Sequence, residues 1–172
     1  MATTIQVAGP TKVMLNEQLL GYSDNDNLPS ITFTDNTHEI KTVLSGAVPE
    51  EIVVTGTSAR ISVALIKWDE NVLATALESL RGQYNSAEVG RLLSAGNFLL
   101  PLRVGNLGDT MYYDFPTVFL QSDSIVDSQW GNRERVLTLN FMALPQTTTT
   151  GNPPVTTVKL FDYVNAGFTP PT

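Results

Sequence analysis

The sequence predicts a mainly β protein, a β-sandwich or barrel subunit with one flanking α-helix. Short segments with alternating hydrophobic and polar residues recur between turn-forming residues, which is the pattern of half-buried strands. Only one segment, at about residues 69–81, has the three- and four-residue hydrophobic spacing of an amphipathic helix. Charged residues make up 16% of the chain, below the roughly 25% of an average globular protein. Because no repeat or change in composition divides the chain, we expect residues 1–172 to form one domain.

The N-terminal strands are predicted where apolar residues alternate between turn formers. These segments are residues 11–15, 30–34, 39–44 and 51–55. The second and third are expected to pair across a turn at residues 35–37, and residues 21–27 are expected to form a loop. Gly46 and Pro49 interrupt the pattern before the fourth segment.

A longer strand is predicted at residues 58–65, where Ile61, Val63 and Leu65 fall on one face. The predicted helix follows it almost without a loop. Asp69 is a preferred N-cap residue, and Gly82 is a typical C-terminal stop.

The second half of the chain predicts further strands at residues 97–104, 112–121, 133–144 and 158–164. Pro101 is expected at a sheet edge or a bulge, and Pro116 is expected to interrupt its strand. The Thr- and Pro-rich residues 145–157 are predicted to be an exposed loop. The expected core consists of Ile61, Val63, Leu65, Trp68, Leu73, Leu77, Leu137, Leu139 and Phe141.

The charge balance argues against nucleic acid and membrane surfaces as attractive partners. The formal net charge is -7, and both halves of the chain carry more acidic than basic residues. An acidic surface without a basic cluster repels phosphates and anionic lipids. The N-terminal segment lacks the basic and apolar regions of a signal peptide, and the longest apolar segment, residues 92–102, is too short and too broken to span a bilayer. We therefore expect a soluble protein without a membrane partner.

No motif in the sequence indicates an enzyme or a metal site. The chain has one histidine, His38, and no cysteine, which excludes multi-histidine and thiolate metal sites. His38 is interpreted as an ordinary surface residue. Residues 24–27 resemble the start of a calcium loop, but Pro29 and Asp35 occupy the positions where glycine and glutamate are needed. We expect no catalytic residue, no metal and no cofactor.

The carboxylate pairs Glu50–Glu51 and Asp123–Asp127 could in principle face each other across a glycosidase cleft. Loop charges that keep strand edges soluble are the simpler interpretation.

Two segments carry a resemblance to a known family. Residues 56–69, GTSARISVALIKWD, match a "GxxAxIxVxLxxWD" pattern that leads into a helix. Residues 136–144, VLTLNFMAL, are one residue out of a "VxLxFxAL" pattern in a late strand. Together with the order of elements over residues 30–145, these patterns resemble the tail tube proteins, or major tail proteins, of long-tailed bacteriophages.

The resemblance implies a structural virion protein. Such subunits close into six-membered rings whose inner sheets join into one barrel, and the rings stack into the tube through which the genome leaves. The implied partners are further copies of the chain and other tail proteins: sheath or terminator, baseplate and tape measure. Genomic DNA would pass without specific binding, and an acidic lumen would favour this. The implied location is the virion tail, assembled in the host cytoplasm.

Two sets of residues are candidates for roles in such an assembly. Contacts between subunits are expected at Val43, Leu44, Gly46, Val48, Pro49, Thr147, Thr148, Pro153 and Pro154, which lie in two long connections, residues 43–53 and 145–157. Lumen charges are expected at Glu50, Glu51, Asp123 and Asp127.

Other interpretations stay open. Another ring-forming tail protein, such as a tail terminator or a baseplate hub component, would share the fold. A carbohydrate- or cell-surface-binding β-sandwich would be a monomer with aromatic residues such as Tyr112, Tyr113 and Trp130 on one exposed face. An enzyme is the third interpretation.

Overall fold

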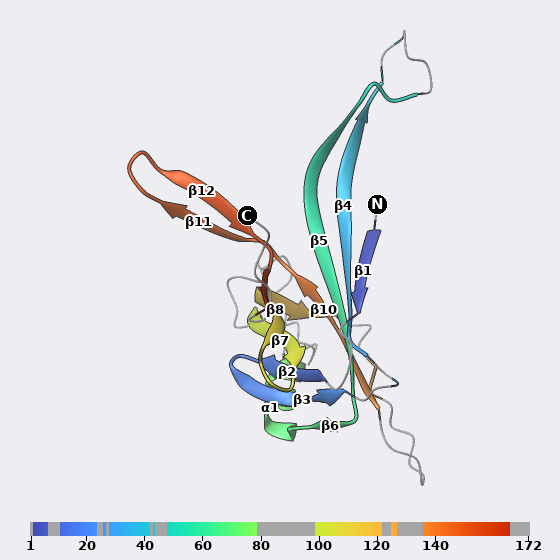
Figure 1. Ribbon diagram of the computed structural model, residues 1–172, viewed down its shortest axis with the longest axis vertical. Helices are drawn as coiled ribbons and strands as arrows, with labels where there is room; N and C mark the ends of the chain where they lie inside the picture. The colour runs from blue at the N-terminus through green and yellow to red at the C-terminus, as the bar shows by residue number, and fades with distance from the viewer. Residues whose placement is uncertain are drawn as a thin grey trace, which may run out of the picture.

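The computed structural model describes residues 2–6, 11–23, 26, 28–41, 43, 48–78, 99–121, 125–126 and 136–165. The described chain is mainly β with one short helix, α1 (Glu70–Glu78), which confirms the predicted fold class (Figure 1). None of its helical segments has the length and apolar character needed to cross a bilayer. The strands are β1 (Ala2–Gln6), β2 (Thr11–Leu15), β3 (Gln18–Ser23), β4 (Ser30–Ile40), β5 (Glu51–Leu65), β6 (Lys67–Trp68), β7 (Leu100–Asn106), β8 (Met111–Leu120), β9 (Ile125–Val126), β10 (Leu137–Ala143), β11 (Gln146–Thr150), β12 (Val155–Lys159) and β13 (Asp162–Asn165).

Eleven of these strands form one antiparallel sheet that curls back on itself. Its path runs β1-β4-β5-β10-β8-β7-β2-β3-β6, with β13 added to β8 and β9 to β10. The sheet closes because β6 follows β5 after a single residue, Ile66, and pairs with β3 at the far end of the path. The Ile66 N–H donates to the Tyr22 carbonyl at 3.1 Å. A Cβ on Gly21 would lie 2.3 Å from the Lys67 carbonyl oxygen, so this close approach of β3 and β6 requires glycine.

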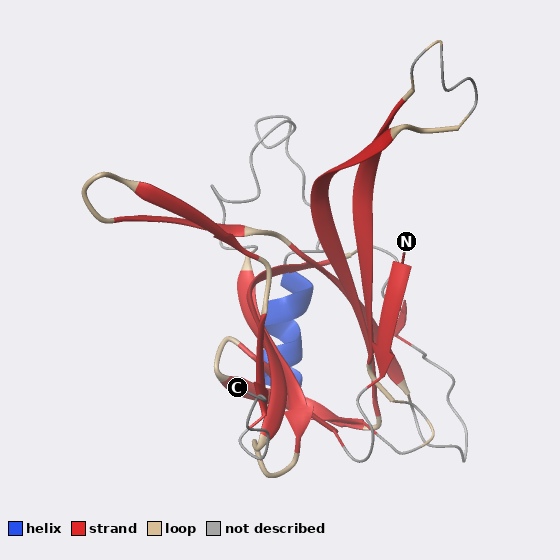
Figure 2. Cartoon of the chain, turned by 45° about the horizontal axis from the view of Figure 1, so that its top comes forward, coloured by secondary structure: helices blue, strands red, loops and turns tan. Residues whose placement is uncertain are grey.

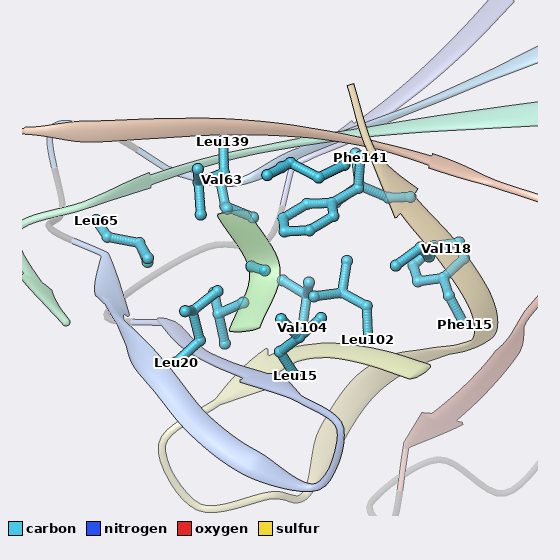
Figure 3. Packing of buried hydrophobic residues seen from close by; sticks show 14 of the residues in the cluster. Leu15, Leu20, Val63, Leu65, Leu102, Val104, Phe115, Val118, Leu139 and Phe141 are labelled. Carbon is cyan, nitrogen blue, oxygen red and sulfur yellow. The ribbon is translucent and has the colours of Figure 1, made fainter. Parts of the chain in front are cut away.

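The core fills the curled sheet, and α1 closes it (Figure 3). Helix residues Val72, Leu73 and Ala76 belong to the same buried cluster as the inward-facing strand residues. Of the predicted core residues, seven are buried: Ile61, Val63, Leu65, Leu73, Leu137, Leu139 and Phe141. Trp68 and Leu77 are only partly buried and pack against the edge of the core, because β6 and the end of α1 lie at its margin.

The predicted N-cap is confirmed. The Asp69 carboxylate accepts hydrogen bonds from the backbone N–H groups of Asn71 at 2.9 Å and Val72 at 3.1 Å. The helix was predicted over residues 69–81 and is observed over Glu70–Glu78; residues 79–81 lie outside the described residues.

Both prolines of the β7–β8 pair lie at a bulge. The register changes from Leu102 opposite Phe115 to Leu100 opposite Val118, which places Pro101 and Pro116 in the irregular part. The bulge predicted for Pro101 is therefore confirmed, whereas Pro116 does not interrupt its strand because the bulge needs no N–H there.

Three predictions about the strands and loops are wrong. Residues 30–40 form one strand, β4, rather than two strands across a turn, because residues 35–37 fit a bulge at which the Thr55 hydroxyl donates to the Asn36 carbonyl. Residues 145–157 are not a loop: β11 and β12 form a hairpin, since threonine and valine favour extended backbone. Residues 158–164 are split between β12 and β13.

Candidate assembly interface

Two β-hairpins project from the body and point away from each other (Figure 2). The first, which we call the ribbon arm, consists of residues 35–40 of β4 and 51–58 of β5. The second, which we call the threonine arm, consists of β11 and β12 with their connecting turn, residues 146–159. Two long segments were singled out by the sequence for contacts between subunits. Residues 145–157 lie mostly in the threonine arm, in β11, β12 and their turn, and residues 51–53 lie in β5 of the ribbon arm. Residues 43 and 48–50 lie outside the strands.

The ribbon arm has two open edges. β1 pairs with β4 only as far as Thr34, and β10 pairs with β5 only as far as Ala59. Beyond these residues, no other described strand pairs with the outer edge of β4 or of β5. Open edges expose rows of backbone N–H and C=O groups that can pair with another chain.

Aliphatic side chains are exposed on both faces of the ribbon arm. On one face, Ile52 and Val54 are 57% and 61% exposed. On the other face, Ile40 and Val53 are 39% and 42% exposed. An isolated two-stranded hairpin is only marginally stable in water. Because this hairpin exposes aliphatic side chains on both faces, contact with another chain would remove apolar surface from water on both sides.

The threonine arm is exposed along its whole length, including Val155 and Val158. Its strands are joined by paired threonines: the Thr149 and Thr156 hydroxyls lie 3.1 Å apart, and Thr157 donates to the Thr148 carbonyl. The arm contains no acidic residue and one basic residue, Lys159, whereas residues 35–58 carry four acidic residues and one lysine. The two arms therefore differ in charge.

An aromatic cluster connects the bases of the arms to the body. The ring of Phe161, just after β12, lies 4.8 Å from that of Phe33 in β4 and 5.9 Å from that of Phe115 in β8. Tyr113 joins the cluster, and burial raises the pKa of its phenol. Phe115 is fully buried, whereas Phe33, Phe161 and Tyr113 are half-buried, so the rings pack largely on one another. Neither Phe33 nor Phe161 belongs to a recognisable sequence motif, so no signal in the sequence points to this cluster.

A polar cluster on the surface of the body surrounds Arg103. Arg103 bonds to Asp114 at 3.0 Å and lies over the ring of Tyr112, 4.2 Å from its centroid. The Asp114 contact raises the pKa of the Arg103 guanidinium. A shallow pocket of about 290 Å³ beside them is lined by Met14, Glu17, Pro101, Arg103 and Asp114. Arg103 and Asp114 neutralise each other, and we interpret them as a structural ion pair; the carboxylate of Glu17 also lines the pocket.

The predicted site residues are placed as follows. Val43 and Val48 are exposed near the end of the ribbon arm, and Pro49 is half-buried. Thr147 and Thr148 lie in β11, and Pro153 and Pro154 in its turn to β12; all four are exposed. Glu50 and Glu51 are exposed at the start of β5. Leu44, Gly46, Asp123 and Asp127 lie outside the described residues.

Within the described residues, no group of three or more His, Asp or Glu side chains could hold a metal ion. His38 is exposed in β4, opposite Val53, in agreement with its interpretation as a surface residue.

Comparison with known proteins adds no assignment to this geometry: no protein-family model matches the chain, and a search of curated proteins gives no match.

Proposed function

We propose that the chain is a structural virion protein, a subunit of the tail tube of a long-tailed bacteriophage. Copies associate through the two arms into six-membered rings, and the rings stack into the conduit for the genome. The observation that supports self-assembly most strongly is the ribbon arm, with two open edges and aliphatic residues on both faces. The tail tube as the particular assembly rests on the resemblance in sequence.

The exposed aliphatic surface is large enough to drive association only together with strand pairing. The exposures of Ile40, Ile52, Val53, Val54, Val155 and Val158 amount to roughly three whole side chains, and covering them would contribute about 5–10 kcal/mol per subunit. Association costs on the order of 4–15 kcal/mol in lost freedom of motion. Because the two terms are similar, the backbone hydrogen bonds of the open edges must contribute the remainder.

Ring formation would also provide pairing partners for the open strand edges of the ribbon arm. In a cyclic assembly an open arm edge of one copy can pair with an open strand edge of the next copy, so the ring leaves fewer edges unpaired. Glu50 and Glu51 then carry negative charge on the arms. A lumen with this charge repels phosphates and releases no counterions to DNA, so the genome slides past without binding.

The mass of the purified chain in solution tests the proposal. Light scattering after gel filtration is expected to give six subunits, six times 18.7 kDa or about 112 kDa, or a multiple of this mass from stacked rings. A terminator or hub component would stop at a single ring, whereas a tube subunit forms longer stacks. A monomer at every concentration would contradict both interpretations and would favour a monomeric binding module.

A further inference from the structure

We propose that β12 of one copy pairs antiparallel with the open edge of β5 in the next copy, with Val155–Lys159 opposite residues 51–55. This inference rests on the proposed self-assembly and assigns one of its interfaces to named residues. The occupant of the β5 edge is therefore a second copy of this chain.

The two strand edges are both available, and the five residues of β12 fit within the open part of β5. β12 pairs with β11 on one side only, and no other described strand pairs with its second edge. The β5 edge is equally open over residues 51–58. In one copy the two arms point apart in both views, so the pairing must join different copies (Figures 1 and 2).

The register is set by charge and by apolar contact. Antiparallel pairing that places Lys159 opposite Glu51 also places Val158 opposite Ile52. Opposite charges and aliphatic residues in facing positions are the cross-strand pairs that stabilise sheets. Lys159 contacts Asp162 in the isolated chain, but both side chains are about half exposed, so this pair is weak and can be exchanged.

The proposed pairing would join β4 and β5 of one copy to β12 and β11 of the next in one sheet, and each face of this sheet gains an aliphatic contact. Ile52 and Val158 meet on one face, and both are more than half exposed in the single chain. On the other face Val53 lies diagonal to Val155, with Thr157 directly opposite. The pairing therefore covers both sides of the ribbon arm.

Other strand edges offer a poorer match. β11 contains a glutamine and four threonines, so it has neither a charge nor an aliphatic residue for β5. Placing Lys159 opposite Asp35 of β4 would put Val158 opposite Asn36 and Val155 opposite Glu39. Placing it opposite Glu39 leaves only two pairs before β4 ends at Ile40.

The proposed interface joins two different surfaces of the subunit. Such heterologous contacts repeat from copy to copy and close into a ring when the rotation permits. Pairing of β12 with β5 is therefore consistent with cyclic assembly. In such a ring, β12 of each copy pairs with β5 of one neighbour, and its β5 pairs with β12 of the other neighbour.

A charge-exchange experiment tests the pairing. Glu51→Lys places two lysines opposite each other, and Lys159→Glu places two glutamates there. Each is expected to raise the protein concentration at half-assembly by about tenfold or more. The double variant Glu51→Lys/Lys159→Glu restores the opposite charges and is expected to assemble like the wild type. Glu70→Lys, on α1 in the body, makes the same change in net charge as Glu51→Lys and is expected to have little effect on assembly.

Disulfide trapping gives an independent readout, because the chain has no cysteine of its own. A mixture of Val53→Cys and Thr157→Cys proteins is expected to form mixed dimers under mild oxidation, since these residues face each other in the proposed register. The pair Val54→Cys and Thr157→Cys is shifted by one residue, so its side chains point to opposite faces and should cross-link far less.

The outcomes separate this inference from the proposed function. If the wild type assembles while Glu51→Lys assembles equally well, or the double variant fails, the β12–β5 pairing is wrong and the ring proposal stands. Equal cross-linking by the two cysteine pairs would also overturn the register. If the wild type stays monomeric and neither pair cross-links, self-assembly itself is wrong.

Discussion

Leu139→Ala is expected to lower the free energy of unfolding by about 2–5 kcal/mol, because truncation removes buried methyl groups and leaves a cavity. Leu139 is fully buried in β10, opposite Val63 of β5, and belongs to the core cluster (Figure 3). The loss is expected near the upper end of the range if the surrounding strands, which are fixed by pairing on both sides of β10, cannot collapse into the space.

Urea unfolding measures this effect. Thr138→Ala is the matched control, because its side chain lies on the other face of the same strand and is only partly buried. The control should lose about 1 kcal/mol or less. A similar small loss for Leu139→Ala would mean that the core does not depend on the inner face of β10.

The double variant Ile52→Ser/Val54→Ser is expected to abolish assembly without unfolding the subunit. Both side chains are exposed in the single chain, so their loss removes little from the core, but it removes the apolar contact on one face of the ribbon arm. Losing this surface weakens association by about 2 kcal/mol or more per subunit. The loss occurs at every interface of a ring, so the total effect on ring formation is several times larger.

Gel filtration with light scattering checks the mass, and circular dichroism checks the fold. Leu107→Ser is the control: it removes an aliphatic residue of similar exposure, 54%, from the turn between β7 and β8 on the body. The control should assemble normally. Normal assembly of the Ile52→Ser/Val54→Ser protein would exclude this face of the ribbon arm from the interface.

The sequence predicts the body of the fold well, because one face of each body strand is buried. Ile61, Val63 and Leu65 alternate with more exposed residues, and their burial follows directly from that alternation. Likewise, Asp69 indicates the start of the only helix among the described residues. Its carboxylate caps backbone N–H groups two and three residues further along the chain, so the signal depends only on neighbouring sequence.

The arms are predicted poorly for a related reason. Residues 146–150, QTTTT, have no alternation, since neither face of the threonine arm packs on its own body. In the ribbon arm, Ile52, Val53 and Val54 are consecutive aliphatic residues, which suits a strand covered on both faces by something outside the chain. Hydrophobic periodicity indicates which face of a strand is buried within its own chain, and it does not identify surfaces that another chain would cover. For this reason residues 145–157 have the pattern of a loop in the sequence, although β11 and β12 are strands.

Negative-stain electron microscopy of the purified wild-type chain is the most direct test of assembly into a tail tube. We expect rings of uniform diameter with six-fold symmetry in end views, and stacked rings or tubes of the same diameter in side views. Uniform single particles of monomer size, at concentrations well above those of a stable assembly, would contradict it.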